Sequence, residues 1–187
     1  PAMLGSGVYA GIFDQHYADT RTDPDGVSFA SAIEAIGYRG KDKAPQALSA
    51  YFELHIEQGP ILEAEERDIG VVTLVQAINW LDVTFSGADS HAGTTPMNRR
   101  KDALAAAAEL MAAIEKIPAS IGSGVATVGT LAIANPSRNV VPGDVTLTVD
   151  LRNPSDEALT AMRSAVEKAA AAIAAKRGVS SSVSVYW

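Results

Sequence analysis

The residues best suited to chemistry gather in Tyr51–Pro60, which reads Tyr-Phe-Glu-Leu-His-Ile-Glu-Gln-Gly-Pro. If the backbone is extended here, successive side chains alternate in direction, so Glu53, His55 and Glu57 share one side. That side could bind a metal, but a zinc site needs three or four ligands and a single histidine specifies no metal. The alternative is a half-buried strand with a charged outer face. The spacing leaves both interpretations open.

A second group of reactive side chains lies in Ser86–Met97, where glycines and hydroxyl-bearing residues surround His91. A histidine among small residues is accessible and can donate a hydrogen bond. The alternative is a loop histidine whose ring is satisfied by the neighbouring hydroxyls. Ser90 does not indicate a serine hydrolase, because the nucleophile-elbow motif is missing and adjacent residues rarely face each other.

Two further candidates, Asn139 and Arg152, flank the same part of the chain. Asn139 lies in a loop bracketed by prolines, and Arg152 ends the strand that follows. Arg152 shares its strand face with polar residues, and a guanidinium there can form a bidentate pair with a substrate carboxylate. It can equally pair with Asp150 or Asp144. The sequence does not choose between these partners.

Composition narrows the classes of function. The 187 residues suffice for one large domain or two small ones, and 47% are hydrophobic and 20% charged, as in globular proteins. A net charge of −7 argues against a nucleic-acid surface. There is no cysteine, so metal ligands must be His, Asp or Glu. No apolar run approaches the ~20 residues of a membrane span, and we expect a cytoplasmic setting. Since the chain begins with Pro1, it resembles the middle of a longer protein.

Periodicity predicts the elements that position His91, Asn139 and Arg152. Strands are expected near residues 79–85, 125–134, 145–151 and 179–187, and helices over 102–117 and 155–177. The order βαββαβ is that of a ferredoxin-like α+β domain, with two helices on one face of a four-stranded antiparallel sheet. We expect Pro118 to stop the first helix, whose buried stripe is predicted to be Leu104, Ala107, Ala108, Met111 and Ile114.

The region before this domain is less regular. Residues 23–26, Asp-Pro-Asp-Gly, predict a turn within a solvated acidic loop, and Ser28 or Ser31 can cap a short helix that Gly37 ends. Residues 61–68 predict a short exposed helix, and the apolar run 70–75 predicts a strand buried on both faces. No core of its own is evident, so we expect residues 1–76 and 77–187 to be separate domains.

Taken together, the motifs resemble the hydantoinase/carbamoylase family of amidohydrolases, whose members include N-carbamoyl-L-amino-acid hydrolases and allantoate amidohydrolases. The resemblance covers essentially the whole chain and rests on the two long motifs together. It is carried by 53–60 (ELHIEQGP), 70–72 (GVV), 87–97 (GADSHAGTTPM), 127–129 (TVG), 139–143 (NVVPG) and 150–152 (DLR).

The resemblance implies a role for each candidate residue. His55 matches a metal ligand, and Gln58 a position near the ureido group of the substrate. His91 matches a catalytic histidine of the lid that stabilises the oxyanion, in the site of its own or of the partner subunit. Asn139 and Arg152 match lid residues that hold the substrate carboxylate. The implied chemistry is attack by metal-activated water on a carbamoyl carbon, with the developing charge shared between His91 and the metal.

The resemblance also implies that parts are missing from this chain. The family binds two divalent metals (zinc, manganese, cobalt or nickel), and of five expected ligands only His55 is present. We therefore expect residues 1–76 to be a partial catalytic domain and 77–187 a lid that also forms a homodimer. The substrate would be a small N-carbamoyl amino acid or ureido acid, and the chain alone is expected to be inactive. The alternatives are a non-catalytic ferredoxin-like dimerisation domain, or a related aminoacylase or dipeptidase.

Overall fold

The computed structural model describes residues 3–41 and 47–186. The chain forms two compact units, Pro1–Asp68 and Ile69–Trp187. The boundary expected at residue 76 falls just inside the second unit, where the first strand begins at Ala77. Among the described residues, no helix is both long and apolar enough to cross a bilayer.

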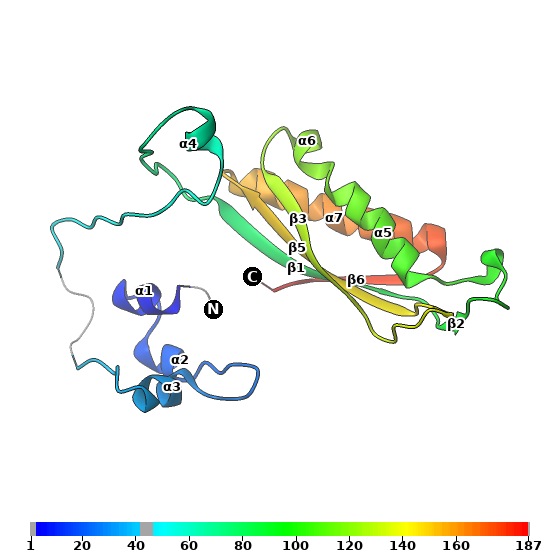
Figure 1. The fold of residues 1–187 in the computed structure, drawn as a ribbon, viewed down its shortest axis with the longest axis horizontal. Helices are drawn as coiled ribbons and strands as arrows, with labels where there is room; N and C mark the ends of the chain where they lie inside the picture. Colours follow the sequence, from blue (N-terminus) through cyan, green and yellow to red (C-terminus); the bar gives the residue numbers. More distant parts are fainter. Residues whose placement is uncertain (1–2, 42–46, 187) are drawn as a thin grey trace. The chain divides into compact units, whose positions relative to one another are not determined.

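The second unit is built on a four-stranded antiparallel sheet (Figure 1). Its strands are β1 (Ala77–Ser86), β3 (Val125–Ile133), β5 (Asp144–Asn153) and β6 (Ser180–Val185), in the order β3-β5-β1-β6. The helices α5 (Ala103–Ile114), α6 (Ile117–Ile121) and α7 (Asp156–Arg177) lie on one face of this sheet. This arrangement confirms the predicted ferredoxin-like α+β class. The last strand was expected to reach Trp187, which lies outside the described residues.

The core lies between the sheet and the two long helices. Along β5, residues alternate strictly between buried and half-exposed positions, as expected for a strand with one face on the core. The central strand β1 repeats this pattern and buries Leu81, Val83 and Phe85 completely. These side chains meet the apolar residues of α5 and α7 in one cluster. Within the described residues of the second unit, no helix covers the opposite face of the sheet, whose side chains remain partly exposed.

The predicted stripe on α5 is confirmed at Ala107 and Ile114, and Leu104 packs partly buried against the core, but the prediction of Ala108 and Met111 is wrong. The buried residues are Ala103, Ala106, Ala107, Leu110 and Ile114, whereas Ala108 and Met111 are exposed. Because this helix is apolar on almost every side, two neighbouring sets of its residues both have the helical spacing of a buried stripe. Packing against the sheet selects between them. Pro118 does not stop the helix either: α5 ends at Ile114, and Pro118 sits in the first turn of α6, where its missing N–H costs nothing.

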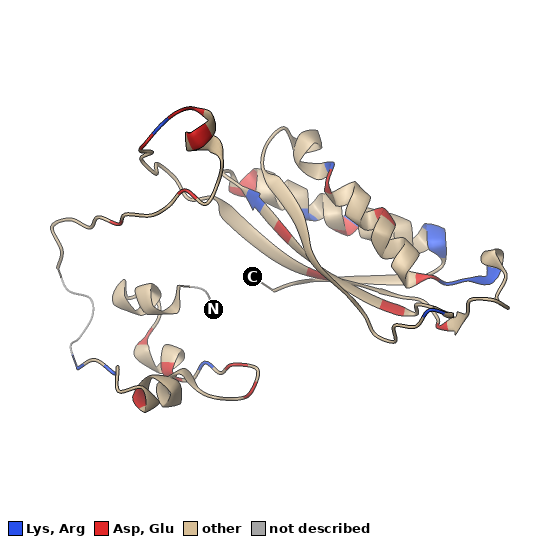
Figure 2. Cartoon of the chain, in the orientation of Figure 1, with Lys and Arg blue, Asp and Glu red and all other residues tan. Residues whose placement is uncertain are grey.

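The caps of α7 agree with the sequence. The Ser155 hydroxyl accepts a hydrogen bond from Ala158 N–H at 3.3 Å, and Gly178 closes the helix at φ 67°. Acidic residues occupy the first turn and basic residues the last, as the helix dipole favours (Figure 2).

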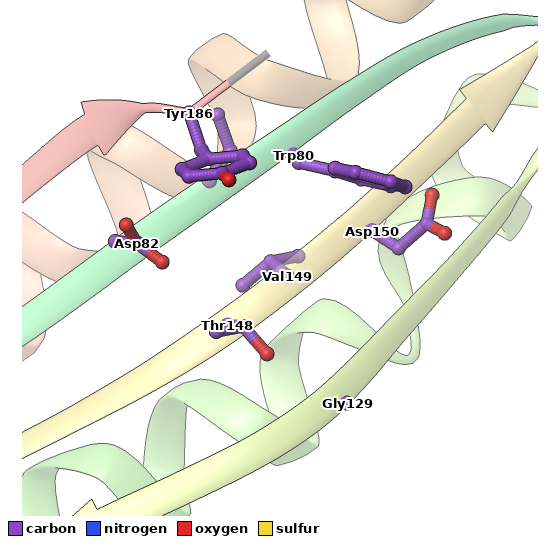
Figure 3. Close-up of a pocket in the computed structure, with 8 residues that line it drawn as sticks. Trp80, Asp82, Gly129, Thr148, Val149, Asp150 and Tyr186 are labelled. Atoms are coloured by element: carbon purple, nitrogen blue, oxygen red, sulfur yellow. The ribbon is translucent and has the colours of Figure 1, made fainter. Parts of the chain in front are cut away.

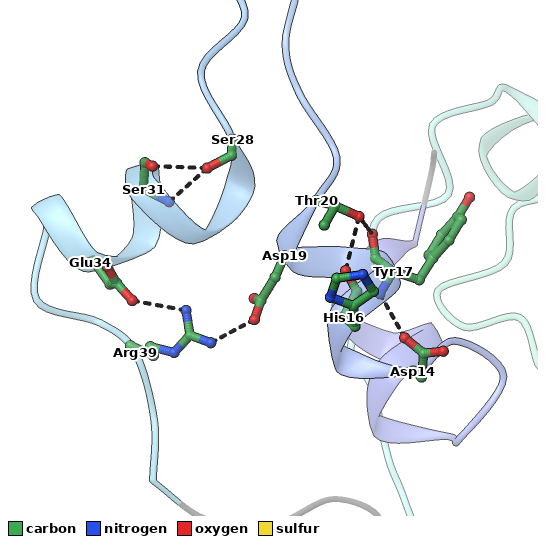
Figure 4. A network of polar contacts seen from close by, with 9 residues as sticks. All are labelled: Asp14, His16, Tyr17, Asp19, Thr20, Ser28, Ser31, Glu34 and Arg39. Carbon is green, nitrogen blue, oxygen red and sulfur yellow. Dashed lines mark hydrogen bonds and ion pairs between the residues drawn. The ribbon is translucent and has the colours of Figure 1, made fainter.

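The described residues of the first unit form the short helices α1 (Leu4–Tyr9), α2 (Gln15–Asp19), α3 (Phe29–Ala35) and α4 (Ile61–Ala64). Ser28 caps α3 as predicted, and Arg39 forms ion pairs with Asp19 at 2.6 Å and Glu34 at 3.0 Å (Figure 4). The Asp23 carboxylate accepts backbone hydrogen bonds that close the predicted turn. Ala18 is its one fully buried hydrophobic residue among those described, so polar contacts hold these helices more than a core does.

The structure differs from the sequence expectations in three irregular segments. Residues 70–75 form no strand and their side chains are exposed, and the same holds for residues 52–58. The helix expected over 61–68 extends only over Ile61–Ala64. A buried strand needs neighbours that satisfy its backbone N–H and C=O groups. No strand in the described part of the chain pairs with these apolar segments, so their hydrophobicity has nothing to pack against.

Candidate functional site

A short two-stranded ribbon brings His91 and Asn139 together. Strand β2 (Ser90–His91) pairs antiparallel with β4 (Val140–Val141), so that His91 lies opposite Val140. One residue further, Ala92 N–H donates to the Asn139 carbonyl at 2.8 Å. Both candidate side chains belong to exposed residues. The structure therefore gathers two predicted site residues that are far apart in the sequence.

Asp89 ties the two segments of this ribbon together. One carboxylate oxygen accepts the Gly143 backbone N–H at 2.6 Å, and the other accepts the Asn135 side-chain amide at 2.9 Å. A Cβ at position 143 would lie 2.6 Å from the Asp89 nitrogen, which explains the glycine there. Gly87 is equally restricted, because a Cβ would lie 2.0 Å from the Lys101 carbonyl oxygen.

Arg100 holds the loop that follows His91. Its guanidinium donates to the Thr95 carbonyl at 3.1 Å and to the Ala92 carbonyl at 2.6 Å. The loop closes on itself through Thr95 N–H, which donates to the His91 carbonyl at 3.0 Å. Charge-assisted hydrogen bonds of this kind are stronger than neutral ones. The backbone around His91 is thus restrained on both sides.

The side chains of His91 and Asn139 each have one defined contact. The His91 Nδ1 accepts a hydrogen bond from Gly93 N–H at 3.0 Å. The Asn139 Oδ1 accepts from the Ser137 hydroxyl at 2.7 Å. Asn139 therefore has its amide N–H groups, and His91 its Nε2, for a ligand. Both can supply hydrogen bonds to an oxygen atom with negative charge.

Arg152 lies on the open face of the sheet and is paired with Asp150. Its Nε and Nη2 atoms contact the carboxylate, with distances of 2.8–3.1 Å. The hydrogen bond to Asp150 raises the pKa of Arg152 above its ordinary value. Of the partners considered from the sequence, the structure thus selects Asp150. Asp150 contacts the edge of the guanidinium formed by Nε and Nη2, so Nη1 remains available to a second anion.

A hollow of about 320 Å³ adjoins this ion pair on the open face of the sheet (Figure 3). Trp80 lies opposite Asp150 on the neighbouring strand, and its ring stacks with Tyr186 at 6.2 Å between centroids. Asp82 and Thr148 line the remainder. The hollow therefore offers an aromatic wall next to charged and hydroxyl groups, a combination common in small-molecule sites.

The two groups of candidates occupy opposite ends of the sheet. The ribbon with His91 and Asn139 adjoins the start of β5 at Asp144, and Arg152 lies near its end. Arg152 lies eight residue steps beyond Asp144 along the strand, a span of roughly 26 Å at the usual rise per residue. A ligand the size of an amino acid cannot touch both groups within one chain.

The stretch Tyr51–Pro60 belongs to the first unit and is exposed throughout. Its polar side chains serve local contacts: Glu53 accepts from the Tyr51 hydroxyl at 2.6 Å, which raises the pKa of Tyr51. Glu57 accepts the N–H groups of Ile61 and Leu62 at the start of α4. The three side chains predicted to share a face are therefore not brought together.

His55 and Gln58 are the two candidate site residues that belong to the first unit. The His55 Nδ1 contacts the Ile56 carbonyl at 2.5 Å. A carbonyl only accepts, so Nδ1 carries the proton and the Nε2 lone pair is left for a metal. Gln58 has a left-handed φ of 55°, which is uncommon outside glycine. Among the described residues, no three His, Asp or Glu side chains are grouped as a metal site requires.

The residues that organise the ribbon were missed at the sequence level. Asp89, Gly93 and Arg100 lie within or beside the predicted motif, but their partners are backbone atoms of loops. Side-chain types and spacing do not reveal such contacts. The small residues around His91 were the one available signal, since a loop without large side chains allows close backbone approach.

Comparison with known proteins identifies the family of this domain. Residues 75–178, more than half of the chain, match the family described as peptidase dimerisation domain. The chain belongs to this family. Over 98% of its length it is 43% identical to an N-carbamoyl-L-amino-acid amidohydrolase of Rhizobium meliloti, and over 83% it is 36% identical to an allantoate amidohydrolase of Bacillus subtilis.

Solved structures give the same assignment. A hydantoinase/carbamoylase family amidase from Burkholderia ambifaria matches the whole chain with 47% identity and a TM-score of 0.85. The predicted resemblance to the hydantoinase/carbamoylase family is thereby confirmed. The chain covers 44% of the Rhizobium protein and 46% of the Burkholderia structure, so it spans less than half the length of these relatives.

Proposed function

We propose that this chain is the lid and an adjoining segment of an amidohydrolase that cleaves the carbamoyl or ureido C–N bond of N-carbamoyl-L-amino acids or allantoate. The observation that carries the proposal is the similarity to N-carbamoyl-L-amino-acid amidohydrolase over 98% of the chain. The β2–β4 ribbon supports it, because it holds His91 and Asn139 at neighbouring backbone positions, and each side chain has a hydrogen-bond donor that can bind negative charge on a substrate.

In this proposal each lid contributes to two sites. Arg152 binds the substrate carboxylate of its own subunit through the edge of the guanidinium that Asp150 does not occupy. His91 and Asn139 reach the site of the partner subunit, where His91 donates to the oxyanion. The strand length between the two groups supports this division, since a small substrate cannot contact both in one chain.

The homodimer is part of the same proposal. The match to a peptidase dimerisation domain supports it, together with two edge strands, β3 and β6, whose outer backbone groups no described strand satisfies. Leu131 on β3 remains 38% exposed although its strand neighbour Leu147 is buried. A second subunit against this edge would cover it.

The two divalent metals that the family resemblance implies do not fit the residues of this chain. His55 offers one nitrogen ligand, and among the described residues no three His, Asp or Glu side chains are grouped so that they could hold a metal ion. We therefore derive no catalytic step through a metal. Gln58 is proposed to lie near the ureido group, because its position in the motif matches that of the family.

A segment exchange tests the proposal. The chain would replace the aligned segment of the Rhizobium meliloti relative, and the chimera would be assayed with N-carbamoyl-L-amino acids, allantoate and N-acetyl-amino acids. We expect hydrolysis of a carbamoyl or ureido substrate and a loss of at least about a hundredfold in kcat for His91→Ala. Preference for N-acetyl substrates would instead favour an aminoacylase.

The isolated chain provides the matching control. We expect no hydrolysis by the chain and no tight two-metal binding in calorimetric titrations with zinc or manganese. Turnover together with tight binding of two metals would refute the proposed division of the site. Lack of turnover with self-association would support the second candidate function, a dimerisation domain, only if the folded chimera were also inactive.

A further inference from the structure

The hydrogen bond between Gly93 and His91 determines which ring nitrogen of His91 carries a proton. The Gly93 backbone N–H donates to Nδ1 at 3.0 Å. A backbone N–H has no lone pair, so Nδ1 must be the accepting, unprotonated nitrogen. In a neutral imidazole the proton then resides on Nε2. The contact therefore selects one tautomer of two.

Hydrogen bonds within the loop restrain the backbone that makes this contact. Arg100 binds the carbonyls of Ala92 and Thr95 on either side of Gly93. Ala92 is fixed from the opposite side by the Asn139 carbonyl. The Gly93 N–H thus belongs to a restrained backbone segment and is presented to the ring, rather than to solvent.

Glycine at position 93 also leaves room for the ring. A Cβ built there would lie 3.1 Å from the His91 Cε1 atom and 3.4 Å from Nδ1. The first of these distances is tighter than most real Cβ contacts. An alanine would therefore require the imidazole to shift by a few tenths of an ångström, which would weaken the contact between Nδ1 and the Gly93 N–H.

We propose that Gly93 is a positioning residue that holds the Nδ1 of His91 as a hydrogen-bond acceptor, so that the ring presents Nε2 as its donor to the oxyanion. This inference rests on the proposed function for the identity of the acceptor. The hydrogen bond itself follows from the chain alone. His55 provides the opposite case, because its Nδ1 contacts the Ile56 carbonyl and must carry the proton.

Nitrogen NMR of the chain tests the proposal without requiring turnover. The chain would be labelled with ¹⁵N-histidine and its imidazole nitrogens observed in long-range proton–nitrogen spectra in mildly alkaline buffer. His91→Gln assigns the His91 signals by their disappearance. We expect an unprotonated Nδ1 and a protonated Nε2 for His91, and the reverse for His55.

Gly93→Ala is the decisive variant. We expect its His91 nitrogen shifts to move toward the average of two exchanging tautomers, while the shifts of His16 and His55 stay unchanged. Gly40→Ala is the matched control, because a Cβ there meets nothing within 4 Å. A protonated Nδ1 in the unaltered chain would overturn the proposal, and so would unchanged His91 shifts in a folded Gly93→Ala chain.

The experiments distinguish a failure of the proposed function from a failure of the proposed positioning role of Gly93. If the tautomer is as expected but the chimera hydrolyses no carbamoyl or ureido substrate, the proposed function is wrong and the positioning of His91 stands. If the chimera is active and the tautomer differs, the positioning role of Gly93 is wrong. In the active chimera, we expect Gly93→Ala to lower kcat about tenfold with little change in KM, since the contact acts on charge that develops during the reaction.

Discussion

The carboxylate of Asp89 joins two loops that the sequence separates widely, those on either side of the β2–β4 ribbon. Its two oxygens accept from Gly143 and Asn135. Removing the acceptor leaves a backbone N–H without its partner, which costs on the order of 1 kcal/mol. Because the contact is local, the cost concerns the opening of the ribbon more than the global unfolding of the sheet.

Asp89→Ala is therefore expected to raise the exchange rate of the Gly143 amide roughly five- to tenfold, as measured by hydrogen exchange. Asp89→Asn serves as the control, since its side-chain oxygen still accepts one hydrogen bond. Equal exchange rates in Asp89→Ala and the unaltered chain would show that the ribbon does not depend on this carboxylate.

The sequence predicted some of the candidate site residues but not the contacts that position them. His91 and Asn139 were named from the sequence, and the structure brings them together, although their roles stay predictions. For Arg152 the sequence left three partners open, and only the strand geometry selects Asp150. The roles of Asp89, Gly93 and Arg100 depend on backbone atoms of distant loops, whose positions cannot be derived from the side-chain types of one segment.

At the scale of the elements, Glu109 on α5 joins two basic residues at the end of α7. Its carboxylate accepts from Lys176 at 2.6 Å and from Arg177 at 2.8 Å. The hydrogen bond from Lys176, followed by that from Arg177, lowers the pKa of Glu109 below its ordinary value of 4.5. These contacts link the C-terminal end of α7 to the middle of α5.

The lowered pKa gives the sign of a pH dependence. A carboxylate whose pKa is lower in the folded state stabilises that state above its unfolded pKa and loses this contribution as pH falls through the folded pKa. Glu109→Gln should thus melt below the unaltered chain near neutral pH. The gap should close below pH 4.5, in thermal melts followed by circular dichroism. A gap that persists at strongly acidic pH would contradict this assignment.

Strong periodicity predicted the elements well where one face was polar. The strand β5 and the helix α7 were predicted close to their observed bounds, because polar and apolar residues alternate at a clear period. The helix α5 lacked such contrast, and two residues of its predicted buried stripe, Ala108 and Met111, are exposed. Residues 70–75 show the opposite error, because an apolar run alone does not supply the neighbouring strands that a buried strand needs.

For the whole molecule, the distribution of the core predicts unequal resistance to unfolding. All residues of the main hydrophobic cluster belong to the second unit. Segments with few buried contacts open at low free energy and are cut first by proteases. The exposed residues 47–60 and 70–75 lie before the first strand of that cluster.

Limited proteolysis should therefore remove the first unit and leave a resistant fragment that begins between residues 47 and 77 and reaches the C-terminal strand. Mass spectrometry of the products identifies its ends. Phe85→Ala, which deletes a fully buried ring of the core, should abolish this resistance, since such truncations cost about 3–5 kcal/mol. Equal protection of residues 3–41 would show that the first unit has a stability that its burial does not explain.

The separation of Arg152 from His91 and Asn139 along β5 has a genetic consequence. If each site takes Arg152 from one subunit and the other two residues from its partner, two inactive variants can repair each other. Mixing His91→Ala with Arg152→Ala chimeras would form hybrid dimers with one doubly altered site and one intact site. Random exchange of subunits would restore roughly a quarter of the sites. Two parental alleles, each a null by itself, would then complement within one cell.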